Sequence, residues 1–244
     1  MKITLTVNAV CDIGCKKPSN EDMILLHDKM FRDGKRKVVF NTKTGFLKDR
    51  VIIAVADGVG GLNKGEIASE QVLKSLSSML MNIPDDLDNV ELRNVFEIYT
   101  AETHASLAKD MGSTLVGLFF YNGKLFKYHA GDSRIYRMIK GEMERLTVDH
   151  SLCESGGQKD APSNVITNSI GGGSSAFIEF AEIENPFGNN YYYLLSSDGM
   201  HDMVSKSEIS NLMDQADGAD KLNDLAKKYG GKDNISIVTV KINM

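Results

Sequence analysis

The chain has 244 residues, of which 42% are hydrophobic and 25% charged, and its formal net charge is −5. This composition excludes a disordered chain and predicts one domain over residues 1–244 with a sizeable core. The acidic balance argues against a nucleic-acid binder, which needs Lys and Arg gathered on one face. No stretch approaches the ~20 apolar residues of a membrane helix, and the first residues do not form a secretion signal. We therefore expect a soluble, cytoplasmic protein with neither nucleic acid nor membrane as partner.

Strands are predicted first along the chain. Alternating or continuous apolar residues between turn signals predict strands over residues 3–10, 23–27, 38–40 and 51–56. Between them, the basic stretch 29–37 contains Asp33-Gly34, a pair that favours a tight turn. A solvated hairpin tip is the simpler interpretation of this stretch, and a binding patch is the alternative.

Two amphipathic helices are predicted next, over residues 65–82 and 90–111, with Pro84 between them as a breaker. Further strands are predicted over 114–121, 124–129, 133–138, 191–195 and 235–242. A second helix pair, over 207–215 and 219–229, lies before the last strand. Helix pairs between runs of antiparallel strands predict an α+β sandwich in which helices pack over sheets.

One acidic pattern recurs along the chain: an aspartate lies beside a glycine, or two residues after one, where a predicted strand ends or begins. The four cases are Asp57-Gly58, Gly131-Asp132, Asp198-Gly199 and Gly230-Gly231-Lys232-Asp233. A strand end fixes a carboxylate on a rigid element, and glycine lets the backbone approach a ligand or offer its carbonyl. Mg²⁺ and Mn²⁺ prefer such oxygen ligands. Asp-Gly is also an ordinary turn pair, so only the joint occurrence of the four cases indicates a metal centre.

Other polar residues have simpler explanations. Glu21 and Asp22 precede a predicted strand and, taken alone, indicate a solvated loop. The chain has three cysteines, which do not form the two CxxC pairs of a zinc site, so we expect reduced thiols. His104 lies in a predicted helix, His129 in a predicted strand and His150 in a short motif, and structural roles are expected for all three.

The chain resembles the metal-dependent protein phosphatase family, of the protein phosphatase 2C type, in its bacterial-like form. The motifs occur in the family's order over nearly the whole chain: Asn20-Glu21-Asp22, Asp57-Gly58-Val59-Gly60-Gly61 with Gly65-Glu66 and Ala68-Ser69, Gly112-Ser113-Thr114, Gly131-Asp132-Ser133-Arg134, Leu146-Thr147-Val148-Asp149-His150-Ser151, Ile166-Thr167-Asn168-Ser169-Ile170-Gly171, Ser197-Asp198-Gly199 and Asp233-Asn234. The resemblance implies a four-layer αββα sandwich, with two antiparallel β-sheets flanked by helix pairs. It also implies hydrolysis of phosphoserine and phosphothreonine by in-line attack of a metal-bridging hydroxide.

The cofactor implied by the resemblance is Mn²⁺ or Mg²⁺, with two ions in the core site. Asp57 would bridge both ions and Gly58 would ligate through its carbonyl. Asp198 and Asp233 would hold the first ion. By this resemblance Asp57 and Asp198 are the main catalytic carboxylates.

Further ligands are implied around this core. Glu21 and Asp22 would serve the second ion, directly or through water. Asp132, together with Asp198, matches a third and weaker site of bacterial members.

The sequence departs from the family pattern in three places. Lys17 stands where the family usually has an Arg that meets the substrate phosphate. Val59 stands where many eukaryotic members have a His proposed as general acid, so the leaving group would be protonated by metal-bound water. The flap near residues 151–166 is shortened, which leaves peptide selection open.

Two other functions remain open. One is a regulatory or binding module that keeps the fold with weak or lost catalysis, although such chains typically lose metal carboxylates and this one keeps them. The other is a metal-dependent hydrolase of small phosphoesters. For the phosphatase, the expected partners are phosphorylated proteins, and the enzyme would oppose a Ser/Thr kinase.

Overall fold

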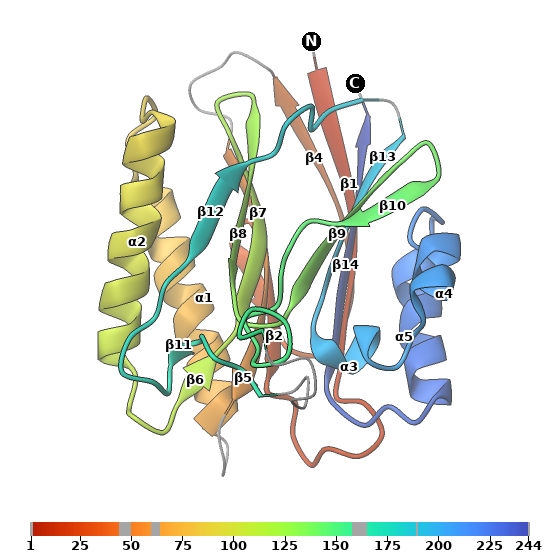
Figure 1. Cartoon of the computed structure of the whole chain (residues 1–244). Coiled ribbons are helices and arrows are strands. Elements are labelled where there is room, and N and C mark those ends of the chain that lie inside the picture. Colours follow the sequence, from red (N-terminus) through yellow and green to blue (C-terminus); the bar gives the residue numbers. More distant parts are fainter. Residues whose placement is uncertain (1, 44–49, 60–63, 158–164, 189, 244) are drawn as a thin grey trace.

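The computed structural model describes residues 2–43, 50–59, 64–157, 165–188 and 190–243. Within them, two antiparallel sheets pack face to face, with helices on both outer faces (Figure 1). The first sheet, called the β1 sheet, has the order β10-β9-β13-β14-β1-β4. Its strands are β1 (Lys2–Asp12), β4 (Gly34–Lys43), β9 (Arg134–Ile139), β10 (Glu142–Arg145), β13 (Tyr191–Ser196) and β14 (Ile235–Asn243).

The second sheet, called the β5 sheet, has the order β11-β6-β5-β7-β8-β12, and β2 adds to it by pairing with β5 and β3. Its strands are β2 (Asp22–Leu26), β3 (Lys29–Phe31), β5 (Arg50–Val59), β6 (Gly112–Ser113), β7 (Leu115–Tyr121), β8 (Lys124–Ala130), β11 (Ile170–Gly171) and β12 (Glu179–Glu182). The hairpin between β7 and β8 turns at Asn122 and Gly123, both at positive φ, as expected for this turn pair.

Helices form the outer layers. They are α1 (Lys64–Asn82) and α2 (Asn89–Ser106) over the β5 sheet, α4 (Lys206–Leu212) and α5 (Gly218–Lys228) over the β1 sheet, and the short α3 (Asp198–His201) after β13. Apolar side chains fill each space between layers: Phe96 and Tyr128 under α2, Leu5 and Val55 between the sheets, and Leu222 under α5. This arrangement confirms the four-layer αββα sandwich.

The predicted elements are confirmed, with differences at their ends. The helix expected over residues 90–111 ends at Ser106, because Leu107 adopts an extended conformation and Ser106 Oγ donates to the Thr103 carbonyl. Strands β3, β6, β10, β11 and β12 and helix α3 were not predicted, since segments of two to four residues show no readable period. No helix in the described part of the chain is long and apolar enough to cross a bilayer.

Gly117 generates a stability prediction. It lies on β7 opposite Tyr128, and a Cβ at this position would overlap the Tyr128 ring. We expect Gly117→Ala to lower the free energy of unfolding by about 1–3 kcal/mol through overpacking, as measured by urea denaturation. The control is Gly173→Ala, whose added Cβ would meet nothing closer than the Ser175 carbonyl at 3.6 Å. Equal stability of both variants would contradict this packing.

Candidate metal centre

Acidic residues from both sheets gather at the end of the sandwich that carries α3 and the start of β2 (Figure 1). Asp22 opens β2 and Asp57 lies near the end of β5. Asp132 lies between β8 and β9, Asp198 opens α3, and Asp233 lies two residues before β14. The structure therefore places the aspartates of the recurring pattern together with Asp22.

Asp22 and Asp57 face each other directly across the β2–β5 pair. Like charges in directly opposed positions destabilise a sheet. Asp22 is fully buried, and its Oδ2 accepts a hydrogen bond from Ser197 Oγ at 2.7 Å. Among the described residues, no donor reaches the other buried oxygen of Asp22, nor the buried Oδ1 atoms of Asp132 and Asp198. Buried carboxylate oxygens without donors are costly, so these three atoms fit a bound cation.

The pKa values report the same crowding of negative charge. Burial raises the pKa of Asp22 to about 7, and the charges of Asp198 and Asp233 add to this effect. Burial also raises the pKa of Asp132 to about 7 and that of Asp198 to about 6. For Asp57, burial and then the charges of Asp22, Asp198 and Asp132 raise the pKa well above its usual range. A divalent cation would oppose each of these shifts, because a nearby positive charge favours the ionised carboxylate.

Gly58 and Gly65 bring a backbone carbonyl and a carboxylate close together. A Cβ on Gly58 would overlap the Gly65 carbonyl and lie 2.8 Å from the Glu21 carbonyl. A Cβ on Gly65 would lie 2.7 Å from both the Gly58 carbonyl oxygen and Glu21 Oε1. The two glycines therefore let β5, α1 and the start of β2 meet. The other glycines of the motif, Gly60 and Gly61, lie outside the described residues.

Lys17 lies at the edge of this cluster. Its Nζ pairs with Asp233 Oδ1 at 2.6 Å, and each side chain is about one third exposed, at 34% and 38%. Burial alone would lower the pKa of Lys17, but the bond to Asp233 and the charges of Asp57 and Glu21 raise it. The ammonium is thus charged and lies at the edge of the carboxylate cluster.

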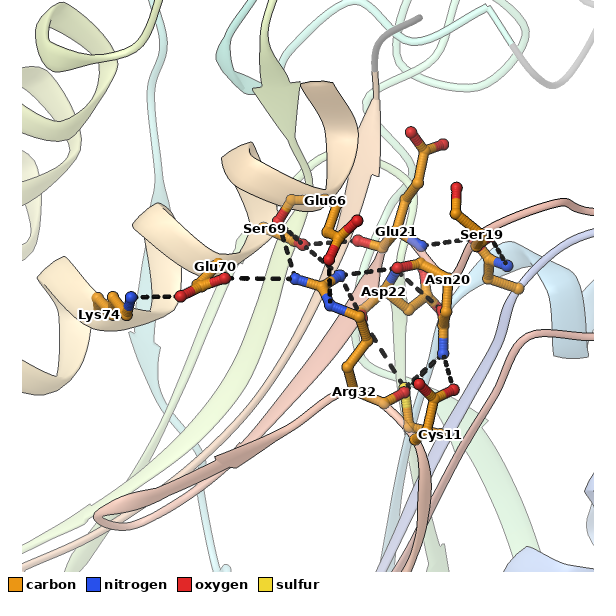
Figure 2. A network of polar contacts seen from close by, with 12 residues as sticks. Cys11, Ser19, Asn20, Glu21, Asp22, Arg32, Glu66, Ser69, Glu70 and Lys74 are labelled. Carbon is orange, nitrogen blue, oxygen red and sulfur yellow. Dashed lines mark hydrogen bonds and ion pairs between the residues drawn. The ribbon is translucent and has the colours of Figure 1, made fainter. Parts of the chain in front are cut away.

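Several polar residues that support the cluster were not singled out from the sequence. Asn234 Oδ1 accepts from the Glu21 amide at 2.8 Å, and its Nδ2 donates to the Ser19 carbonyl at 3.0 Å. Ser69 Oγ donates to the Glu21 carbonyl at 2.6 Å (Figure 2). The family motifs contain Asn234 and Ser69, and their order was the only available signal, because their contacts join distant segments.

The expected solvated hairpin tip at residues 29–37 is wrong. Lys29–Phe31 pairs with β2 and Gly34–Lys43 pairs with β1, so this stretch connects the two sheets and is not a hairpin. The side chain of Arg32 is only 14% exposed and turns toward the start of β2 and toward α1 (Figure 2). Arg36, by contrast, is exposed and donates to the neighbouring Lys35 carbonyl. Nothing in a run of alternating basic residues distinguishes the partly buried arginine from the exposed one.

A second cluster, of His129, His150 and Glu179, offers one ligand atom each within 4.8 Å of the others. The Asn168 amide is oriented by two bonds to the Phe177 backbone, so its Nδ2 donates to His150 Nδ1 at 2.8 Å. His150 Nε2 therefore carries the proton and faces Glu179 Oε1 at 3.3 Å. This protonated nitrogen therefore cannot act as a ligand for a cation.

Both histidines instead hold the turn before Asp132. Gly131, at φ +110°, donates its amide to His150 Nδ1 at 3.2 Å, and its carbonyl accepts from His129 Nε2 at 2.7 Å. Burial and the neighbouring His129 lower the pKa of His150, which keeps its ring neutral. His104 Nδ1 likewise accepts from the Gly171 amide at 3.0 Å. These contacts agree with the structural roles expected for the three histidines.

Comparison with known proteins identifies relatives over the whole chain. The sequence profile of the family described as protein phosphatase 2C matches residues 41–225. The protein phosphatase PhpP of Streptococcus pneumoniae is 31% identical over 262 residues, which covers 98% of both chains. The serine/threonine phosphatase of S. agalactiae superposes with a TM-score of 0.78 at 26% identity, covering 97% of this chain and 98% of the other. The catalytic domain of the phosphatase PstP, solved with two manganese ions, gives a TM-score of 0.75 at 25% identity, covering 99% and 100%.

The raised pKa values predict how stability depends on pH without metal. Between its ordinary value of 3.8 and about 7, Asp22 binds a proton in the folded state but not in the unfolded state. Stability must then fall as the pH rises through this interval. In chelator, we expect the melting temperature to decrease from pH 5 to pH 8, and Mn²⁺ to reverse the decrease.

Asp22→Asn provides the check, because it removes one of the crowded charges. In chelator at pH 8 the variant should have a higher melting temperature than the parent. Addition of Mn²⁺ should no longer raise the melting temperature of the variant. Asp86→Asn, at an exposed position, is the control. A melting temperature that is constant or rises from pH 5 to pH 8 in chelator would show that these carboxylates do not repel one another.

Proposed function

Because the chain belongs to the protein phosphatase 2C family of metal-dependent serine/threonine phosphatases, we propose that it dephosphorylates phosphoserine and phosphothreonine in proteins at the carboxylate cluster around Asp57. The observation that carries this proposal is the directly opposed pair of Asp22 and Asp57, surrounded by buried carboxylate oxygens that no donor in the described residues satisfies. Added positive charge would stabilise such an arrangement. The family resemblance of the sequence motifs is confirmed by the profile match.

The described ligand atoms support two core cations, Mn²⁺ or Mg²⁺. Asp57 lies centrally, since four other aspartates contribute to its raised pKa, and is proposed to bridge both ions. Asp198 and Asp233 are assigned to the first ion with the carbonyl of Gly58, because the charge of Asp233 adds to burial in raising the pKa of Asp198. Asp132 and the buried oxygen of Asp198 are assigned to a weaker third ion.

The second core ion is assigned to Glu21 and Asp22, directly or through water. A Cβ on Gly65 would lie 2.7 Å from both Glu21 Oε1 and the Gly58 carbonyl oxygen, so the absence of a side chain at this position lets the two proposed ligands approach each other. Asp22 keeps one oxygen fixed by Ser197 and the other without a donor in the described residues. The two residues thus offer carboxylate oxygens at the start of β2.

When bound, the cations would lower the pKa of a coordinated water and neutralise the phosphate oxygens during in-line displacement. The chain's own residues would bind the cations and orient the substrate phosphate. Lys17 is proposed to contact the phosphate, because its ammonium is charged and partly exposed beside Asp233. Val59, which is 45% exposed, carries no titratable group. Side-chain proton donation to the leaving group therefore cannot come from that position.

The alternatives differ in what they predict for the cluster. A regulatory module without catalysis would not need the carboxylates, which are present and brought together. A hydrolase of small phosphoesters would use the same cluster, so substrate comparison must decide. The flap is defined in part: Ser151 pairs with Ile166, while residues 158–164 lie outside the described residues. We further propose that the chain forms one domain and acts in the cytoplasm against a Ser/Thr kinase.

Metal removal and Asp57 provide the first test. Hydrolysis of a phosphothreonine peptide should require Mn²⁺ or Mg²⁺ and stop with chelator, because the ligand set is all oxygen. Asp57→Asn should lower kcat by ~10³ or more, the scale of losing a main catalytic group. Activity that survives exhaustive chelation would exclude metal-dependent chemistry. Faster turnover of small aryl phosphates than of any phosphopeptide would favour the small-phosphoester alternative.

Lys17 provides the second test. Lys17→Ala should raise KM for a phosphopeptide several-fold, because it removes a contact made in both ground and transition states. Lys17→Arg should match or improve on the parent, since a guanidinium binds phosphate with two donors. Lys16→Ala is the control, as it removes the same charge from the neighbouring position. Equal, salt-sensitive effects of both alanine variants would mean that Lys17 contributes only general attraction.

A further inference from the structure

We propose that Arg32 is a positioning residue of the metal centre, which sets the conformation of residues 20–22 and thereby places Glu21 and Asp22 for a divalent cation. Arg32 lies between β3 and β4, and its partly buried guanidinium reaches two separate elements (Figure 2). This inference rests on the proposed function, because it assumes that Glu21 and Asp22 serve a cation.

The guanidinium binds the backbone on both sides of Glu21. Arg32 Nη1 donates to the Asn20 carbonyl at 2.9 Å and to the Asp22 carbonyl at 3.0 Å. The carbonyl between them, that of Glu21, accepts from Ser69 Oγ at 2.6 Å and from the Gly58 amide at 3.2 Å. Three consecutive carbonyls are therefore fixed, two of them by one nitrogen atom.

Strand pairing alone does not fix this segment on the β3 side. In the described residues, β2 pairs with β3 from Ile24 to Leu26, so the Asp22 carbonyl lies beyond that ladder. Arg32 directly follows β3, and its side chain supplies the donor that the shorter strand lacks. The guanidinium thus extends the hydrogen bonding of β2 up to the proposed metal ligands.

The same side chain ties the segment to α1. Arg32 Nη2 donates to the Glu66 carbonyl at 2.8 Å, in the first turn of that helix. Nε lies 3.5 Å from Glu66 Oε1, and Nη2 lies 3.9 Å from Glu70 Oε2. Two carboxylates thus offset the positive charge, which would otherwise repel a cation at the neighbouring site.

Asn20 in turn binds the backbone of Arg32 and fixes its position. Asn20 Nδ2 donates to the Arg32 carbonyl at 2.5 Å and to Asp33 Oδ1 at 3.1 Å, while Asn20 Oδ1 accepts from the Asp22 amide at 3.1 Å. Backbone and side chain of Arg32 therefore bind the same segment. A lysine would keep the charge, but its single ammonium cannot span the carbonyls of residues 20 and 22 and also the carbonyl on α1.

The test compares Arg32→Lys with Arg36→Lys, a matched exchange at the exposed arginine of the same stretch. Calorimetric titration with Mn²⁺ should give a dissociation constant about ten- to a hundredfold higher for Arg32→Lys, the range found when residues that orient metal ligands are changed. Arg36→Lys should bind as the parent does. At limiting Mn²⁺ the kcat of Arg32→Lys should fall and recover with excess Mn²⁺, while KM for phosphopeptide stays near the parent value.

Arg32→Ala with and without millimolar guanidinium provides a second measurement. Guanidinium should lower the Mn²⁺ dissociation constant of this variant and leave Arg36→Ala unchanged. A parental Mn²⁺ dissociation constant in Arg32→Lys would overturn the inference. A lower melting temperature of Arg32→Lys in chelator with an unchanged Mn²⁺ dissociation constant would also overturn it, because Arg32 would then have a purely structural role. If the parent protein itself shows neither Mn²⁺ binding nor hydrolysis, the proposed function fails, and this inference with it.

Discussion

The repulsion between buried carboxylates is the constraint on which the functional end of this molecule depends. Asp22 and Asp57 are directly opposed in neighbouring strands, and three further aspartates lie close enough to shift their pKa values. A fold selected for stability alone would place an opposite charge or an apolar pair there. This energetic cost supports the proposal that a cation, and not a side chain, completes the structure at this end of the sandwich.

Side-chain hydrogen bonds hold the backbone around these carboxylates in place. The amide and carbonyl of Glu21 bind Asn234 and Ser69, and the turn before Asp132 is held by His129 and His150. These contacts come from segments far apart in the sequence, so both sheets and α1 must be assembled before the carboxylates are aligned. Rigid supports of this kind set the positions of ligands more closely than a mobile loop can.

The pair of Lys17 and Asp233 links charge balance to substrate binding. One Oδ of Asp233 accepts from both the Lys17 ammonium and the Asn234 amide. A cation on Asp233 would neutralise the carboxylate that now holds the ammonium. Lys17 would then be available to an anion, and both partners are exposed enough to allow this exchange. Metal and phosphate binding are thus expected to support each other through one ion pair.

The sequence predicted the parts of this structure that depend on local pattern. Strand periods, helix spacing and the position of aspartates at strand ends were readable, and so was the family, because its motifs occur in a fixed order. The support of residues 20–22 by Arg32 was not readable. Arg32 and Arg36 have the same chemistry and lie four residues apart, yet Arg32 is partly buried and Arg36 is exposed. What distinguishes them is that β2 extends past β3 at the metal end, leaving a carbonyl that needs a donor. That difference in strand length is a property of the assembled sheet, and it assigns to one arginine a role that local sequence cannot show.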